Sequence, residues 1–335
     1  MRPFKYSKVG DVSAALQKIS EGTSVKFLAG GTNLLDLMKE DVERPEELID
    51  ITNIPLNDVK LIVTGANSGG ISLGALAKNT TTANHPLVRQ NFPLLTQAIL
   101  AGASAQIRNM ATNGGNLNQR TRCPYFYDVV MPCNKRQPGS GCGALEGVNR
   151  MHAIFGWSEK CVAVHPSDMC VALAALDAVV KVKGRNEERS IPFSEYHRLP
   201  GDTPEKDNNL NEGELITSIE IPPNNFQKNY YYLKVRDRSS YAFALVSVAV
   251  ALETAASEIK KARIALGGVA HKPWRAAEAE NYLAGKTANE NSFKEAAMLA
   301  LKDAKPLSEN KYKVELANKA IVRALMQAMK GGAHS

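Results

Sequence analysis

The sequence has no long hydrophobic run, which argues against a membrane-spanning protein. Its longest nearly apolar stretch, Tyr241 to Leu252, is too short to cross a bilayer and is interrupted by Ser247. The N-terminus, Met1-Arg-Pro-Phe-Lys-Tyr-Ser-Lys, has a basic start but no apolar stretch behind it. We therefore expect neither a transmembrane segment nor a signal peptide in this chain.

Aromatic residues are also scarce, at 6% of the sequence. A nucleic-acid binder usually gathers its basic residues on one stretch and interleaves them with aromatic side chains for base stacking. Here the 41 basic residues exceed the 34 acidic ones by seven, but most of them are scattered. We therefore expect no nucleic-acid partner, and an anionic cofactor or an acidic protein partner explains the charge better.

Cysteine is missing from most of the chain. All five cysteines fall inside one window of 48 residues: Cys123, Cys133, Cys142, Cys161 and Cys170. An odd number without a signal peptide argues against a disulfide framework, and ordinary core cysteines would be scattered. The clustering therefore indicates a metal or iron–sulfur site.

The length of 335 residues predicts about two domains. Short strands and helices are expected up to Pro222-Pro223, which marks a boundary. Beyond it the pattern changes to three strands (230–236, 243–253, 260–267) followed by three helices (274–283, 290–302, 311–330). This order predicts an α+β fold with domains at 1–223 and 224–335. Within the first domain the expected elements are helices at 11–20, 80–88 and 92–101 and strands at 24–28, 46–51, 59–64, 70–75, 177–183 and 214–221.

Two Gly-Gly turns are candidates for phosphate binding. Gly30-Gly31 follows a β run and precedes a helix, and a second pair lies in Thr112-Asn-Gly-Gly-Asn116. Glycine lets the backbone approach an anion closely, and helix N-termini attract negative charge. The first pair lacks the third glycine of a Rossmann loop and the Lys-Ser/Thr of a P-loop. Flanking Thr and Asn donors predict that the two turns grip the two phosphates of one dinucleotide.

The spacing of the cysteines excludes two common metal motifs. The gaps of nine, eight, eighteen and eight residues contain neither a C-x₂₋₄-C zinc knuckle nor a ferredoxin run. Residues 120–165 are expected to form a long loop, which is usually functional, and seven basic residues against three acidic ones between 108 and 160 would offset an anionic cluster. Cys170 lies in an apolar helical stretch typical of a buried, inert thiol. The expected [4Fe–4S] ligands are Cys123, Cys133, Cys142 and Cys161, with His152 or His165 as possible replacements.

Taken together, several stretches resemble the flavin-binding, or medium, subunit of the molybdenum hydroxylases, the family of xanthine dehydrogenase and carbon monoxide dehydrogenase. The resemblance covers nearly the whole chain and implies a two-part FAD-binding domain, about 1–55 and 56–223, followed by a smaller C-terminal domain. The stretches that carry it are Leu28-Ala-Gly-Gly-Thr-Asn-Leu-Leu, Gln106-Ile-Arg-Asn-Met-Ala-Thr-Asn-Gly-Gly-Asn-Leu, His165-Pro-Ser-Asp, Gly213-Glu-Leu-Ile, Lys234-Val-Arg-Asp-Arg, Ala244-Leu-Val-Ser-Val-Ala-Val-Ala-Leu and Ala265-Leu-Gly-Gly-Val-Ala.

The resemblance also implies where FAD binds. The two glycine turns would cradle its pyrophosphate, Asp168 would contact the ribityl or flavin region, and Lys234 would lie near the isoalloxazine ring. A lysine there would stabilise negative charge on reduced flavin. The full expected set is Phe27, Leu28, Ala29, Gly30, Gly31, Thr32, Asn33, Leu34, Thr112, Gly114, Gly115, Asn116, Leu117, Asp168 and Lys234.

The cysteine loop departs from most of the family. Gln119-Arg-Thr-Arg-Cys-Pro-Tyr-Phe opens an insertion that looks like the flavin subunit of bacterial periplasmic aldehyde oxidoreductases, which carries an extra [4Fe–4S] cluster; 4-hydroxybenzoyl-CoA reductase is the alternative. The implied complex is a heterotrimer in which a molybdopterin subunit oxidises an aldehyde with water to a carboxylic acid. A [2Fe–2S] subunit then relays electrons to FAD on this chain, which passes them to an external acceptor.

Two further points follow from the resemblance. A twin-arginine signal on the small subunit would carry the folded complex to the periplasm, with the cytoplasm as the alternative location. Two other hypotheses remain open at this point: a scaffold whose loop binds zinc, and a stand-alone flavin oxidase of the same wider fold.

Overall fold

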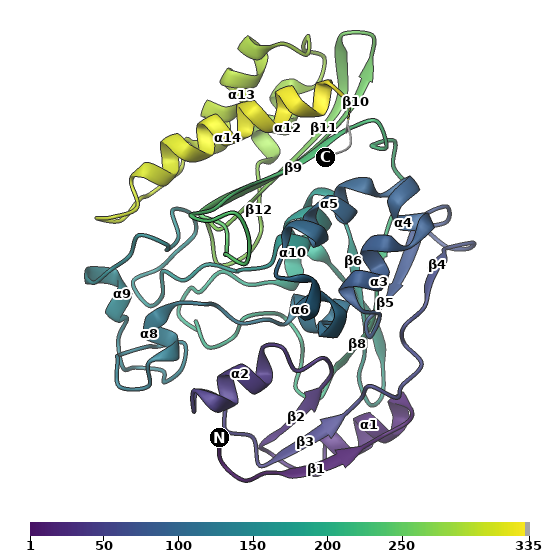
Figure 1. Ribbon diagram of the computed structural model, residues 1–335, viewed down its shortest axis with the longest axis vertical. Helices are drawn as coiled ribbons and strands as arrows, with labels where there is room; N and C mark the ends of the chain where they lie inside the picture. Colours follow the sequence, from purple (N-terminus) through teal and green to yellow (C-terminus); the bar gives the residue numbers. More distant parts are fainter. Residues whose placement is uncertain (332–335) are drawn as a thin grey trace.

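The computed structural model describes residues 1–331, and its three β-sheets follow one another along the chain (Figure 1). Helices lie between and over these sheets. The fold is therefore of the α+β class, which confirms the prediction from the order of elements.

The first sheet is small and parallel, and its strands lie in the order β1 (Lys5–Lys8), β3 (Glu47–Asp50) and β2 (Val25–Leu28). Helix α1 (Val12–Ile19) begins after Asp11, whose side chain accepts a hydrogen bond from the Ala14 N–H at 2.8 Å. Helix α2 (Leu34–Lys39) follows β2 directly. This short β2–α2 connection is the position of the first glycine turn.

The second sheet is antiparallel, in the order β4 (Val59–Leu61), β5 (Ile71–Gly74), β8 (Leu215–Ile221), β6 (Val179–Lys183) and β7 (Glu188–Pro192). Its helices are α3 (Asn79–Asn84), α4 (Pro86–Asn91), α5 (Pro93–Ala101), α6 (Ala105–Met110), α7 (Asn113–Leu117), α10 (Asp168–Ala175) and α11 (Phe193–Tyr196). Apolar residues of β5, β6 and β8 form one core with those of α5 and α10.

Three local features of this region differ from the sequence prediction. The helix expected at 80–88 is two helices, because Pro86 has no N–H and starts α4 instead of continuing α3. Strand β7 was not expected, because its residues Glu188–Pro192 are mostly polar. The second Gly-Gly turn is itself the one-turn helix α7.

The third sheet has the antiparallel order β12 (Trp274–Arg275), β11 (Glu258–Gly267), β10 (Val246–Ala255) and β9 (Asn229–Val235). Helices α12 (Ala277–Leu283), α13 (Glu290–Leu301) and α14 (Tyr312–Met329) cover its outer face (Figure 1). Helices α5 and α10 pack on the other face. Strand β10 is therefore buried on both sides, which explains the nearly continuous apolar run in its sequence.

The residues between α7 and α10 form the long loop expected around the cysteines. It holds only two helices of one turn each, α8 (Pro124–Tyr127) and α9 (Gly143–Glu146). We call residues 120–165 the cysteine loop. No helix in the described part of the chain combines the length and the apolar character that a bilayer crossing requires.

Candidate functional site

A cleft of about 1570 Å³ opens between the first sheet, the second sheet and the third. Its walls include both glycine turns, the end of α5 and the start of α10. Further lining comes from residues 205–216 and from residues that follow β9. The size and the position of this cleft make it the candidate cofactor site.

The first glycine turn has no room for side chains. A Cβ on Gly30 would lie 2.1 Å from the Met110 carbonyl oxygen, and Gly31 has a φ of +72°, which favours glycine. Gly30 therefore packs directly on the backbone that leads into the second turn. The structure thus brings together two turns that are more than 80 residues apart in the sequence.

The second glycine turn is held from behind by buried polar side chains. The hydroxyl oxygen of Thr112 caps α7 by accepting a hydrogen bond from the Gly115 N–H at 3.2 Å. Asn113, which is fully buried, donates to the Gly74 carbonyl at 3.1 Å and accepts from Asn79 at 3.1 Å. Sequence analysis missed Asn79 and Asn113, because a buried amide between distant segments leaves no local pattern.

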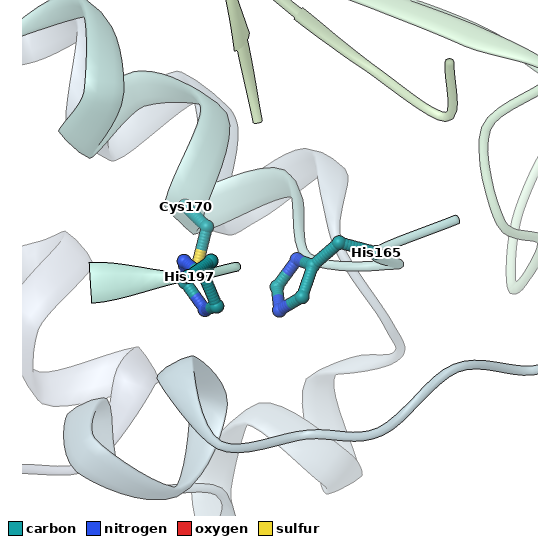
Figure 2. Close-up of side chains that lie close together, drawn as sticks. All are labelled: His165, Cys170 and His197. Carbon is teal, nitrogen blue, oxygen red and sulfur yellow. The ribbon is translucent and has the colours of Figure 1, made fainter. Parts of the chain in front are cut away.

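Behind the second turn lies a compact group of three buried side chains, His165, Cys170 and His197 (Figure 2). Their ligand atoms lie within 4.8 Å of one another, and Nε2 of His197 is 2.9 Å from the Leu117 carbonyl oxygen, which it reaches as a donor. Burial lowers the pKa of His197 to about 4 and raises that of the Cys170 thiol to about 12. Neutral side chains in these positions brace the end of α7.

Asp168 and Lys234 form a buried ion pair beside the cleft. Nζ of Lys234 lies 2.7 Å from Oδ2 of Asp168 and also donates to the Ala101 carbonyl at 3.1 Å. The Tyr232 hydroxyl donates to Oδ1 of Asp168 at 2.7 Å. Both oxygens of Asp168 therefore accept hydrogen bonds from protein donors at the edge of the cleft.

The structure places most of the expected FAD-binding residues in the wall of the cleft. Three are not part of that wall: Leu28, Leu117 and Lys234. Lys234 lies behind Asp168 and does not line the cleft itself; it pairs with the carboxylate that does.

The cysteine loop brings four free thiols together. The backbones of Cys133 and Cys142 pair in an isolated antiparallel β-bridge, and both thiols are free. Cys123 shares one apolar cluster with Cys133 and a second one with Cys142. Cys161 is buried, and its thiol interacts electrostatically with those of Cys133 and Cys142. Cys170 belongs instead to the core of the second sheet.

The environment of Cys123 and Cys161 opposes ionisation of their thiols in the absence of a bound cation. Burial raises the pKa of Cys123 to about 12 and that of Cys161 to about 11, although the nearby Lys135 ammonium favours the Cys161 thiolate. Thiol ligands lose their protons when metal binds. Burial also lowers the pKa of His152 to about 4, and its Nε2 lies 3.1 Å from Sγ of Cys123.

Side chains tie the cysteine loop to itself. Oδ1 of Asn134 accepts hydrogen bonds from Gly139 N at 3.0 Å and Gly141 N at 2.9 Å, while its amide donates to the Lys160 carbonyl at 3.0 Å. These bonds join the segment around Cys133 to the residue before Cys161. A loop without strands or long helices is shaped in this way around its thiols.

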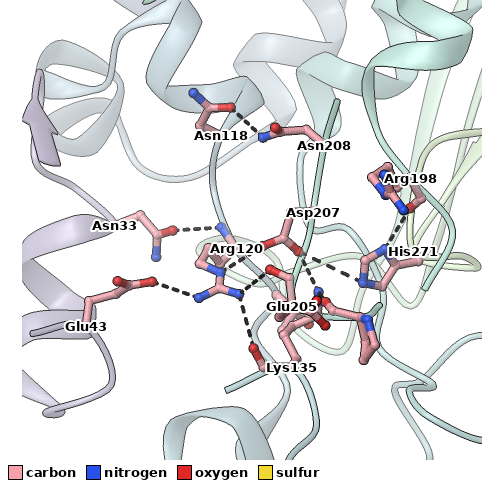
Figure 3. Close-up of polar contacts among 12 residues, drawn as sticks. Asn33, Glu43, Asn118, Arg120, Lys135, Arg198, Glu205, Asp207, Asn208 and His271 are labelled. Atoms are coloured by element: carbon pink, nitrogen blue, oxygen red, sulfur yellow. Dashed lines mark hydrogen bonds and ion pairs between the residues drawn. The ribbon is translucent and has the colours of Figure 1, made fainter. Parts of the chain in front are cut away.

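An ion network connects the cysteine loop to the first glycine turn (Figure 3). Asp207 is its centre, with Oδ2 2.8 Å from Nε of Arg120 and Oδ1 2.6 Å from Nζ of the buried Lys135. Arg120 also pairs with Glu43 at 2.7 Å, and its backbone N–H donates to Oδ1 of Asn33 at 2.8 Å. Burial alone would raise the pKa of Asp207, but the two cations hold it well below its usual range.

Comparison with known proteins assigns both parts of the chain. Residues 2–224 match the FAD binding domain in molybdopterin dehydrogenase, and residues 231–328 match the CO dehydrogenase flavoprotein C-terminal domain. The chain belongs to the FAD-binding medium subunits of the molybdenum hydroxylases. This confirms the family that the glycine motifs resembled.

The relatives of this flavin subunit are subunits of oxidoreductases. The aldehyde oxidoreductase FAD-binding subunit PaoB of Escherichia coli K12 is 46% identical over 98% of this chain and 99% of its own length. The carbon monoxide dehydrogenase medium chain of Hydrogenophaga pseudoflava is 25% identical over 97% of this chain and 96% of its own length. A solved carbon monoxide dehydrogenase from the same organism superposes with a TM-score of 0.76 at 25% identity, covering 98% of both chains.

Proposed function

We propose that this flavin subunit carries both FAD and a [4Fe–4S] cluster and transfers electrons in a molybdenum-dependent aldehyde oxidoreductase. The observation that carries the proposal is the loop of four free thiols beside the flavin cleft. The similarity of the chain to the E. coli aldehyde oxidoreductase subunit, over nearly the full length of both, favours an aldehyde as the substrate of the complex. Aldehyde oxidation itself would take place on a molybdopterin-binding partner chain.

The cleft fits FAD by its own chemistry. When bound, FAD accepts two electrons and releases them to an acceptor, while the protein sets its position and electrostatics. The two glycine turns line the cleft with backbone that carries no side chain, which lets a pyrophosphate approach it closely. Asp168, held in place by Lys234 and Tyr232, lines the cleft as a fixed acceptor for a hydroxyl or ring N–H.

The donor set of the cysteine loop fits an iron–sulfur cluster better than a structural zinc ion. Cys123, Cys133, Cys142 and Cys161 supply four thiolates, the usual ligand number of a [4Fe–4S] cluster. Paired knuckles, which most structural zinc sites use, are missing here. The buried Lys135 ammonium lies on the same loop and would offset part of the cluster's negative charge.

The proposal includes an assembly and a location. Electrons would arrive from a [2Fe–2S] subunit and leave to an external acceptor, within a heterotrimer that contains a large molybdopterin subunit. The named relatives support this assembly, since they are medium subunits of such enzymes. Export of the folded complex by a twin-arginine signal on the small subunit would place it in the periplasm. Cell fractionation that found the complex in the cytoplasm would refute this location only.

The test is the cofactor content of the complex purified without oxygen. We expect one FAD on this chain and about four irons with four sulfides at the cysteine loop. Cys142→Ser should lose that iron while keeping FAD, and Cys170→Ser should keep both. FAD without loop iron in the unmodified complex would refute the cluster, and equal iron loss in both variants would refute the choice of ligands.

A further inference from the structure

The side chain of His152 contacts the sulfur of Cys123, one of the four candidate ligands in the cysteine loop. Nε2 of His152 lies 3.1 Å from Sγ of Cys123, and the imidazole is almost fully buried, with 3% of the residue exposed. The two residues are 29 positions apart, so the contact is made by the fold of the loop. Such a contact fits either a hydrogen bond to a ligand or a replacement ligand.

The main chain of His152 is locked from two sides. Its N–H donates to the Asn149 carbonyl at 3.0 Å. Its carbonyl accepts hydrogen bonds from the Asn310 amide at 3.1 Å and from Nζ of Lys313 at 3.0 Å. These donors come from α14 and the residue just before its first turn, so the third sheet's helices hold the imidazole against Cys123.

The Lys313 ammonium is itself fully buried and fixed by three carbonyls. Besides His152 it donates to Met151 at 2.8 Å and to Gly268 at 2.8 Å. This arrangement fixes the main chain of His152, and the burial of the side chain leaves the ring little freedom to turn away from the sulfur. A hydrogen-bond donor held beside a ligand sulfur orients that ligand and changes the properties of the metal centre.

The protonation pattern favours a donor at Nε2. Nδ1 of His152 is buried and has no hydrogen-bond partner in the described structure. A neutral imidazole carries one N–H, and a thiolate sulfur has no proton to give. Only the tautomer with the proton on Nε2 turns the 3.1 Å contact into a hydrogen bond, and it leaves no buried N–H without an acceptor.

We propose that His152 is a positioning residue that donates its Nε2–H to Sγ of Cys123, which holds that thiolate as a ligand and raises the reduction potential of the cluster. The inference rests on the proposed function, since it needs the [4Fe–4S] cluster. Hydrogen bonds to ligand sulfurs stabilise the more negative, reduced state, and they are among the factors that set the potentials of iron–sulfur centres. His152 is thereby assigned a role beside the four cysteines instead of in place of one.

The test is a potentiometric titration of the complete complex, purified without oxygen, with the cluster followed by electron paramagnetic resonance. His152→Leu removes the donor, and we expect at least a tenfold lower ratio of reduced to oxidised cluster at a fixed potential, which is 59 mV for a one-electron couple. His152→Gln keeps an N–H donor and should recover much of that shift. The flavin midpoint, measured in the same titration, should not change. The partly exposed His85, changed to Leu, is the matched control.

Iron analysis separates donor from ligand. As a donor, His152 can be replaced by Leu or Gln with iron retained, whereas Cys123→Ser loses it. The reverse pattern would make His152 the ligand and overturn the proposal. An iron-loaded His152→Leu complex with an unchanged midpoint would also overturn it.

A measurement on the unmodified complex covers the case in which the Leu variant does not assemble. With ¹⁵N-histidine incorporated, the reduced cluster should show only weak nitrogen coupling and a proton that exchanges in D₂O. Strong ¹⁵N coupling, as from a direct ligand, would refute the donor role. Failure of the proposed function looks different, because the unmodified complex would then hold no iron at this loop.

Discussion

The two glycine turns, residues 29–34 and 112–117, lie beside the cysteine loop, and we call them the glycine cradle. The cradle and the loop differ in what holds them in shape. The cradle consists of short regular elements whose polar groups are already paired: Thr112 caps α7, and Asn113 bonds to β5 and α3. The cysteine loop has few regular elements and holds four free thiols, and burial disfavours the charged form of two of them, Cys123 and Cys161.

This difference separates two kinds of cofactor site. The cradle is complete as protein alone, so it is preorganised and should keep its shape when empty. The cysteine loop instead relies on side-chain hydrogen bonds and ion pairs, and without a bound cation its four thiols contribute only modest apolar contacts. We therefore expect FAD loss to leave the fold almost unchanged and cluster loss to loosen the cysteine loop.

Asp207 tests this comparison, because its partner Arg120 also bonds to Asn33 of the first glycine turn. Asp207→Asn leaves Lys135 and Arg120 without their shared carboxylate, and removing one partner of a largely buried pair costs about 3 kcal/mol of the free energy of unfolding. Denaturation of the purified complex, together with its FAD and iron content, measures the effect. The exposed Asp202, changed to Asn, is the control. Loss of iron without any effect on FAD affinity would show that the network serves the cysteine loop alone.

The same carboxylate predicts a pH dependence. The pKa of Asp207 in the folded protein lies below its ordinary value, so its contribution to stability is present above about pH 4 and is lost as the pH falls through the lower folded value. The difference in unfolding temperature between the native protein and Asp207→Asn should be constant from pH 7 to 5. Below about pH 4 it should shrink. A difference that grows on acidification would contradict this assignment.

Gly30→Ala tests the glycine cradle separately from the cysteine loop. The new Cβ would lie 2.1 Å from the Met110 carbonyl, so the two glycine turns must move apart. We expect FAD affinity to fall about a hundredfold, or about 2.8 kcal/mol, with iron content unchanged. Flavin release on dilution is a direct measurement. Gly10, where a Cβ has open space, provides the control variant Gly10→Ala.

The smallest effect is expected at the helix cap. Thr112→Val removes the hydroxyl that accepts from Gly115 N, which costs about 1 kcal/mol and weakens FAD binding several-fold. Thr112→Ser keeps the cap and should bind FAD normally. Equal affinity of the Val and Ser variants would show that the turn does not depend on its cap.

How much of this could be predicted from the sequence depends on the range of each interaction. The glycine turns were recognisable because their residues are contiguous, and the cysteine loop because its cysteines crowd one window. Arg120 and Asp207 are 87 residues apart and Asn79 and Asn113 are 34 apart, so no local pattern marks either pair. Lys234 was expected near the flavin ring; the structure pairs it with Asp168, which lines the cleft, and its place relative to the ring stays a prediction.

His152 shows the same limit within one loop. Its position near the cysteines made it a possible ligand, but the sequence contains no information on which ring nitrogen faces which sulfur. That information depends on Asn310 and Lys313, which hold its carbonyl from the far end of the chain.

The link between residues 151–152 and Lys313 also sets an order of events during synthesis. The Met151 and His152 carbonyls receive their donors from a residue made more than 160 positions later. A nascent chain that ends before α14 therefore lacks the Lys313 donor, and the His152 carbonyl then keeps only its bond from the Asn310 amide. The donor to the Met151 carbonyl and the second donor to the His152 carbonyl are therefore added only once α14 has been made, so the backbone behind the Cys123 contact is completed late in synthesis.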